Sequence, residues 1–184
     1  MQPNIDNATF DRVTIDHAHH EVHEGNHYFI SNFATVGSGI GSSLWFDITV
    51  PNNGSRIHLF YEVQGTLVTR IKLFEGATLS GGTTISKSNS DRNSSNNSIL
   101  VFKSQPTVSG TTATSGTLIS ASSFGLSVGN GASSIKFGGV INRENELILK
   151  SGITYLLEIN SSTDLNLIDY IFNWYEIVPQ GTGY

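Results

Sequence analysis

The sequence contains no cysteine and few charged residues. Of its 184 residues, 14% are Asp, Glu, Lys or Arg, against roughly 25% in a typical soluble domain. Without cysteine the chain has no disulfide, no thiolate nucleophile and no Cys-based metal site. Ser, Thr and Asn take the place of the missing charges. A weakly charged polar surface of this kind favours strands and turns over long exposed helices, which are rich in Glu and Lys.

Positive charge is both scarce and dispersed. The chain has 10 Lys and Arg and 15 Asp and Glu, giving a formal net charge of −5, and no two basic residues are adjacent. We therefore expect no direct contact with nucleic acid, because no basic patch is present to neutralise phosphates. No window approaches the roughly 18 apolar residues of a membrane span. The first residues also lack the pattern of a signal peptide, so we expect no membrane partner and synthesis in a cytoplasm.

Short runs rich in β-branched and aromatic residues recur between turn signals. Ser43–Val50 ends at Pro-Asn-Asn-Gly, and Arg56–Val63 has alternating apolar positions. The remaining runs are Tyr28–Phe33, Leu67–Phe74, Ile99–Lys103, Thr117–Ser120, Ser134–Phe137, Glu146–Leu149, Thr154–Ile159 and Leu167–Val178. This pattern is typical of an all-β sandwich or barrel.

Helical periodicity is nearly absent, and the one stretch compatible with a helix is Asp16–Glu24. We therefore predict an N-terminal arm with a histidine-rich segment over residues 1–30, followed by a single β-sandwich domain over residues 31–184. In the last strand, Tyr170, Phe172 and Trp174 are predicted to share one face.

The middle of the chain is poor in charge and in aromatic residues. Between Gly76 and Ser134 the charged residues are Lys87, Asp91, Arg92 and Lys103. Two interpretations remain open for this region. It forms long polar loops between strands, or it provides a contact surface on an assembly.

Five of the six histidines lie between His17 and His27, among carboxylates. Imidazole and carboxylate are common ligands of transition metals. The letters His23-Glu24-Gly25-Asn26-His27 also match the H-E-x-x-H motif of zinc proteases. That motif requires a helix, but Gly and Asn are poor in helix interiors and the next residues indicate a strand. The match is therefore interpreted as accidental.

A short helical turn gives the same histidines a different geometry. His19 and His23 would share one face, as would His20 and Glu24, and Asp16 would cap the turn. These side chains are then either solvated or packed in an interface, or they hold a structural or inter-subunit metal. The metal candidates are His19, His23 and His27, although no metal or other cofactor is required by the sequence. Histidines at an interface would make assembly sensitive to pH.

Signatures of catalysis are missing from the sequence. It contains no G-x-S-x-G elbow and no phosphate-binding loop, and we expect no enzymatic activity. Trp45, Tyr61, Trp174 and Tyr175 would offer stacking faces to a sugar if exposed. Each lies in a strongly apolar run, however, which favours core packing.

Several segments together resemble one family of viral proteins. They are HHEVHEGNHYF, LFEGATLSGGTTI, SDRNSSNNS, ENELILKSGITYLLEINSS and FNWYEI, which occur in this order between Asp16 and Ile177. The sequence resembles the capsid decoration (auxiliary or cement) proteins of tailed bacteriophages. This resemblance implies a jelly-roll-like β-sandwich that forms homotrimers on the outer face of the virion capsid, with the major capsid protein as its partner. It implies no catalytic residue.

Within that family the polar N-terminal segment is the expected contact with the capsid or with another copy. Its residues are Asp16, His17, His19, His20, Glu21, His23, Glu24 and His27. Two alternatives remain open. One is a receptor- or carbohydrate-binding module of a tail fibre or adhesin, which needs exposed aromatic side chains. The other is a metal-dependent hydrolase that uses His19, His23 or His27.

Overall fold

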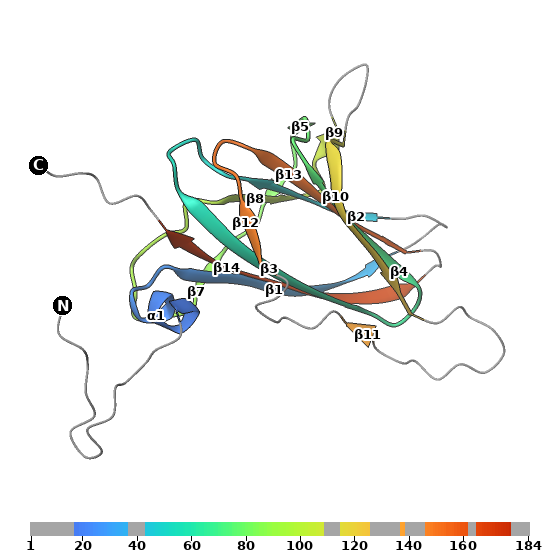
Figure 1. Cartoon of the computed structure of the whole chain (residues 1–184). Helices are drawn as coiled ribbons and strands as arrows, with labels where there is room; N and C mark the ends of the chain where they lie inside the picture. Colours follow the sequence, from blue (N-terminus) through green and yellow to red (C-terminus); the bar gives the residue numbers. More distant parts are fainter. Residues whose placement is uncertain are drawn as a thin grey trace, which may run out of the picture.

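Two antiparallel β-sheets packed face to face, with one short helix at one end, make up the fold (Figure 1). The structure is a computed structural model that describes residues 17–36, 43–108, 115–125, 137–138, 146–161 and 165–177. The elements are α1 (His17–His23), β1 (His27–Val36), β2 (Ser43–Thr49), β3 (Arg56–Gly65), β4 (Thr69–Glu75), β5 (Leu79–Ser80), β6 (Thr83–Thr84), β7 (Ser88–Asn89), β8 (Val101–Ser104), β9 (Thr107–Val108), β10 (Thr117–Phe124), β11 (Phe137–Gly138), β12 (Leu147–Leu149), β13 (Thr154–Ser161) and β14 (Asn166–Ile177). The predicted all-β sandwich is confirmed.

The order of the strands defines the topology. One of the two large sheets has the order β11-β3-β14-β1-β7, with β12 also beside β3, and the other has the order β10-β4-β13-β2-β8-β6. A small third sheet pairs β5 with β9. The chain crosses from one sheet to the other between β1, β2, β3 and β4, and again between β12, β13 and β14. These crossings place β14 between β1 and β3, and β13 between β2 and β4. This is the strand order of a jelly roll, in which two Greek keys form two sheets.

Strand β14 is the central strand of the first sheet. It pairs with β1 from His27↔Tyr175 to Val36↔Asn166, and with β3 from Ile168↔Gly65 to Ile177↔Arg56. Because side chains alternate along a strand, its inner face carries Tyr170, Phe172 and Trp174, all of them buried. The predicted shared face of these three aromatic residues is confirmed.

Aromatic rings from both sheets meet in the core. The ring of Phe172 lies 5.0 Å from that of Phe46 on β2 and 4.8 Å from that of Phe102 on β8. Trp174 packs against Phe102 and against Tyr28 on β1. Tilted and offset arrangements at such distances are favourable for aromatic pairs. The core therefore ties β1 and β14 of one sheet to β2 and β8 of the other.

The polar middle of the chain contributes to the core as well as to the surface. Leu100 and Phe102 are fully buried, and Ile85 and Ile99 pack against the core cluster. Polar contacts hold the loop that leads to Leu100. Lys87 Nζ donates to the carbonyl oxygens of Ser98 and Leu100 at 3.2 and 2.5 Å. The expectation of polar loops therefore holds only for part of this region.

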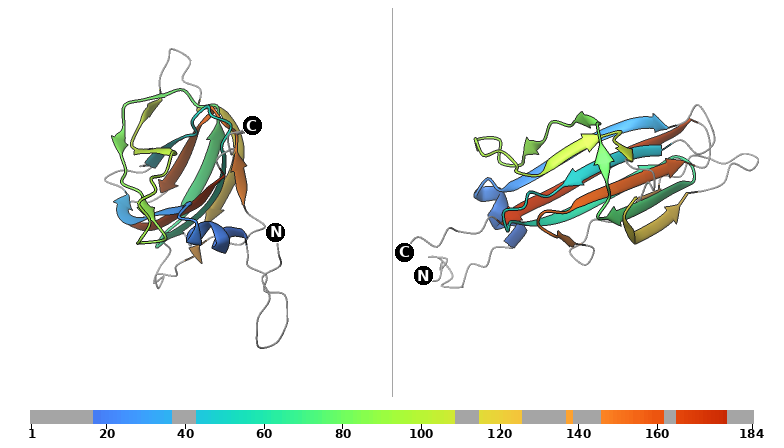
Figure 2. Two further views of the ribbon diagram at one scale, coloured as in Figure 1. Left: turned by 90° about the vertical axis from the view of Figure 1, so that its left-hand side faces the viewer. Right: turned by 90° about the horizontal axis from the view of Figure 1, so that it is seen from above.

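The predicted N-terminal arm, residues 1–30, overlaps the first strand of the sandwich. β1 begins at His27, so His27–Ile30 belong to the first sheet although they lie in the segment predicted as an arm. The rest of the described segment is α1, which lies at the end of the sandwich beside the end of β14 (Figures 1 and 2). Residues 1–16 lie outside the described residues, and among those that are described no helix has the length and apolar character needed to cross a membrane.

Candidate functional site

Helix α1 ends in a well-formed capping motif. Asn26 N donates to Glu21 O at 2.8 Å, and Gly25 N donates to Val22 O at 3.1 Å. This hydrogen-bond pattern is a Schellman motif, which requires a left-handed residue after the helix. Gly25 provides it with a φ of 72°. Because this turn separates His23 on the helix from His27 on β1, the H-E-x-x-H letters do not lie on one helix. This agrees with the interpretation of the match as accidental.

The turn after α1 is clamped by the Asn- and Ser-rich loop. Asn89 Nδ2 donates to Gly25 O at 2.8 Å, and Asn96 Nδ2 donates to Glu24 O at 3.3 Å. A side chain at Gly25 would collide with Ser94, since a Cβ there would lie 2.3 Å from Ser94 Oγ. The loop and the end of the helix therefore fix each other's position.

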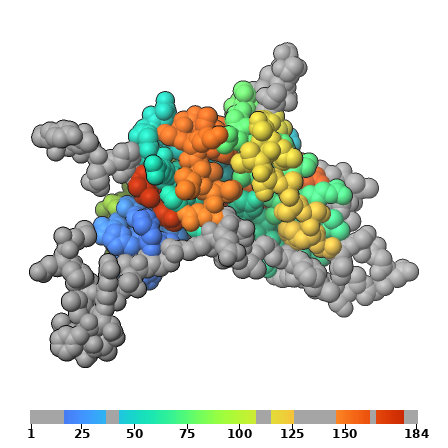
Figure 3. Space-filling model, in the orientation of Figure 1, coloured from blue at the N-terminus to red at the C-terminus, as the bar shows by residue number. Residues whose placement is uncertain are grey.

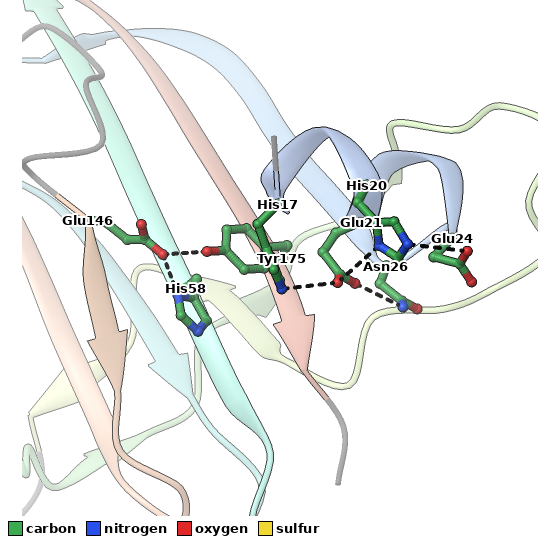
Figure 4. A network of polar contacts seen from close by, with 8 residues as sticks. All are labelled: His17, His20, Glu21, Glu24, Asn26, His58, Glu146 and Tyr175. Carbon is green, nitrogen blue, oxygen red and sulfur yellow. Dashed lines mark hydrogen bonds and ion pairs between the residues drawn. The ribbon is translucent and has the colours of Figure 1, made fainter. Parts of the chain in front are cut away.

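The inner side of α1 is organised around Glu21, which is only 8% exposed. Its carboxylate accepts a hydrogen bond of 3.1 Å from Asn26 Nδ2. It also lies 3.7 Å from His17 Nε2 and 3.7 Å from His20 Nδ1 (Figure 4). A buried carboxylate needs such partners, so these contacts hold the helix and the turn that follows it together.

The outer side of α1 faces solvent. His19 and His23 are both exposed, and their Nε2 atoms lie 3.1 Å apart with the rings nearly perpendicular. His20 Nε2 lies 3.8 Å from Glu24 Oε1. Both predicted pairs are therefore formed. Asp16, the predicted cap, lies outside the described residues.

His27 is separated from the other histidines. Its ring is partly buried on β1, and its Nδ1 lies 2.6 Å from Ser90 Oγ. Burial lowers the pKa of His27 below its ordinary value. The structure therefore pairs His19 with His23 but does not bring His27 to them. In the described ranges no three His, Asp or Glu side chains are grouped so that they could hold a metal ion.

A second polar cluster, which the sequence does not predict, lies on the outer face of the first sheet. Tyr175 OH donates to Glu146 Oε1 at 2.6 Å, and His58 Nδ1 contacts the same oxygen atom (Figure 4). The rings of His58 and Tyr175 stack 4.4 Å apart because the β3–β14 register makes these two residues neighbours. The Tyr175 ring also lies 5.5 Å from that of His17. The cluster thus connects the sheet to α1.

The chemistry open to this second cluster is limited by burial. His58 Nε2 is buried and, in the part of the chain that the structure describes, has no hydrogen-bond partner. A general base must reach the proton that it removes, and this nitrogen atom is not exposed to do so. We interpret the cluster as a support that fixes α1 on the sheet.

The aromatic residues considered for sugar binding are mainly structural. Trp174 is buried in the core, as predicted, whereas Tyr175 is buried on the outer face of the first sheet, against His58. Trp45 and Tyr61 are half-buried, and the indole nitrogen of Trp45 is shielded from solvent. The described aromatic residues therefore present no pair of exposed tryptophan faces.

No protein-family model matches this chain, and comparisons with curated proteins and with solved structures give no match.

Proposed function

We propose that the protein is a capsid decoration protein, which binds the outer surface of an assembled bacteriophage capsid and stabilises it. The single observation that carries this proposal is the corner formed by α1. The corner is polar and exposed, yet Glu21, the Schellman motif and the Asn-rich loop hold it in one conformation. A preorganised surface loses little conformational entropy when it binds. The jelly roll and the resemblance of the sequence to decoration proteins support the same conclusion.

The capsid contact is assigned to the outward side chains of this corner. His17, His19, His20, His23 and Glu24 are all exposed on α1. Glu21 is buried, and the ring of His17 also lies against that of Tyr175. The predicted contact segment therefore divides into residues that hold the helix and residues that would meet the major capsid protein.

Contacts between copies are assigned to β10, one of the two edge strands of the second sheet. The strand carries no charged residue, and Leu118 and Ile119 are 51% and 44% exposed. A bulge between Leu118 and Ser120 leaves Ile119 without a partner in the register. Figure 3 shows this strand, in yellow, on the surface of the molecule. Exposed apolar side chains on an uncharged edge favour association, which supports contacts between copies; the homotrimer itself is the form that the resemblance implies.

A bridging protein of this kind stabilises the capsid by mass action. It binds a site that exists only when several shell subunits are assembled, and so it favours the assembled state. Several weak contacts within one trimer then act together, because each later contact is intramolecular.

A sedimentation experiment tests the proposal. The protein is mixed with purified procapsids and with expanded capsids of the cognate phage, and the pellets are analysed. We expect binding to expanded capsids and a higher temperature of capsid disruption. A double variant His19→Glu/His23→Glu should bind less, whereas Thr84→Glu, on exposed β6, should bind normally. Failure to bind either shell, or binding without stabilisation, would contradict the proposal and favour the receptor- or carbohydrate-binding alternative.

A further inference from the structure

The outward face of α1 carries two imidazole nitrogen atoms that lie close together. His19 and His23 are four residues apart on the helix, and their Nε2 atoms are separated by 3.1 Å. Two imidazole nitrogens bound to one metal ion at 2.0–2.1 Å, with an angle between 90° and 109°, lie about 2.9–3.4 Å apart. The separation of 3.1 Å in the structure lies within this range.

We propose that His19 and His23 form a bidentate site for a divalent late transition metal, of which Cu²⁺ is the strongest-binding example. In the metal-free chain one Nε2–H group donates to the other Nε2 atom. Binding places the metal ion between the two nitrogens, and the displaced proton moves to Nδ1 of the same ring, so that both rings remain neutral. Both side chains are exposed, which leaves their rings free to turn toward the ion.

The choice of metal follows from the ligands. Imidazole suits Cu²⁺, Ni²⁺ and Zn²⁺, and affinities for such sites rise toward Cu²⁺, whereas Ca²⁺ and Mg²⁺ require oxygen ligands. Among the described side chains no third ligand is grouped with this pair. Water, or donors from another molecule, would complete the coordination sphere.

The position of the pair on a fixed helix strengthens the inference. α1 is held by the contact of Glu21 with Asn26, by the capping motif and by the loop amides. The two ligands are therefore kept one helical turn apart before the metal arrives, which lowers the entropic cost of chelation. This inference does not depend on the capsid proposal, because it rests only on the geometry of the two rings.

Copper binding by the full chain, without an affinity tag, tests the site. Calorimetric titration with Cu²⁺ measures affinity, and electron paramagnetic resonance reports the nitrogen atoms bound to copper. We expect His19→Ala and His23→Ala each to weaken copper binding by at least about 10- to 100-fold. Removal of a residue that only supports a metal ligand already causes a loss of this size. The wild-type spectrum should show two coordinated nitrogens, and each variant only one.

His20→Ala is the matched control, since it removes an imidazole from the same helix. The His20 ring faces Glu21 and Glu24 rather than His19 or His23, so copper affinity should not change. Circular dichroism verifies that all three variants keep the wild-type fold. The proposal is overturned if His20→Ala weakens binding as much as the other two variants, or if His19→Ala and His23→Ala retain wild-type affinity.

Discussion

Trp174 and Tyr175 are consecutive residues of β14, and they belong to two regions built in different ways. Trp174 points into the core, among aromatic rings from both sheets. Tyr175 points to the outer face, where it contacts Glu146, His58 and His17. The core depends on apolar area and shape, which many combinations of residues could provide. The outer face around Tyr175 and α1 depends on particular polar partners, and few other residues could replace each of them.

The largest expected effect comes from the core. Phe172→Ala should lower the free energy of unfolding by about 3–5 kcal/mol, because it leaves a cavity between the sheets. Urea denaturation measures this loss. Phe33→Ala provides the control: Phe33 is 67% exposed, and its removal should change stability by less than about 0.5 kcal/mol. Equal losses from the two substitutions would contradict the assignment of Phe172 to the core.

Glu176 tests the polar boundary of the core. Its carboxylate accepts hydrogen bonds from Trp174 Nε1 at 3.0 Å, from Ser98 Oγ at 2.5 Å and from Ile99 N at 3.1 Å. Glu176→Ala should cost about 2–3 kcal/mol, because buried donors lose their acceptor. Glu176→Gln keeps one acceptor oxygen and should cost less. Thermal unfolding ranks the three proteins, and an unchanged melting temperature in both variants would contradict this role.

Glu21 tests the outer corner. Glu21→Ala should lower the free energy of unfolding by about 1 kcal/mol or less. Because the helix loses its central partner, amide hydrogen exchange relative to wild type should increase more in α1 than in the rest of the protein. Glu24→Ala is the matched control, since the Glu24 side chain is 60% exposed. If Glu21→Ala instead destabilised the core as much as Phe172→Ala, the two regions would not be separable.

The smallest expected effect is a dependence on pH at His27. Because burial lowers its pKa from the ordinary value of 6.5, the unfolded chain binds this proton more readily than the folded one. This contribution to stability is present above about pH 6.5 and is lost as the pH falls through the lowered pKa of the folded state. His27→Gln should therefore lose less stability than wild type between about pH 7.5 and about pH 5. Parallel pH profiles of denaturation would exclude the effect.

The sequence predicts the core better than the corner, for a physical reason. Alternating apolar residues reveal a strand locally, and most strands were found, although β4 begins at Thr69 rather than at Leu67. There the amide of Leu67 is held in a turn by Asn166 Oδ1 at 2.9 Å, a partner from the other end of the chain. Local periodicity carries no information about such a distant contact.

The same limit explains the candidate site. The pairing of His19 with His23 was predicted, because residues four apart on a helix are neighbours by geometry. The contact of His58 with Glu146 joins residues 88 positions apart, so only the assembled sheet brings them together. The alternation in Arg56–Val63 places His58 away from the core, and this was the only available signal.

The central positions of β13 and β14 constrain how the protein folds. Each is paired on both sides, and they are the last of the described strands in chain order. Until they are synthesised, β1 cannot join β3 and β2 cannot join β4, so four strand edges stay open. Such late, non-local pairing slows folding and exposes edges that bind other chains. A nascent chain that ends before residue 154 would therefore expose four unpaired strand edges rather than form part of the sandwich.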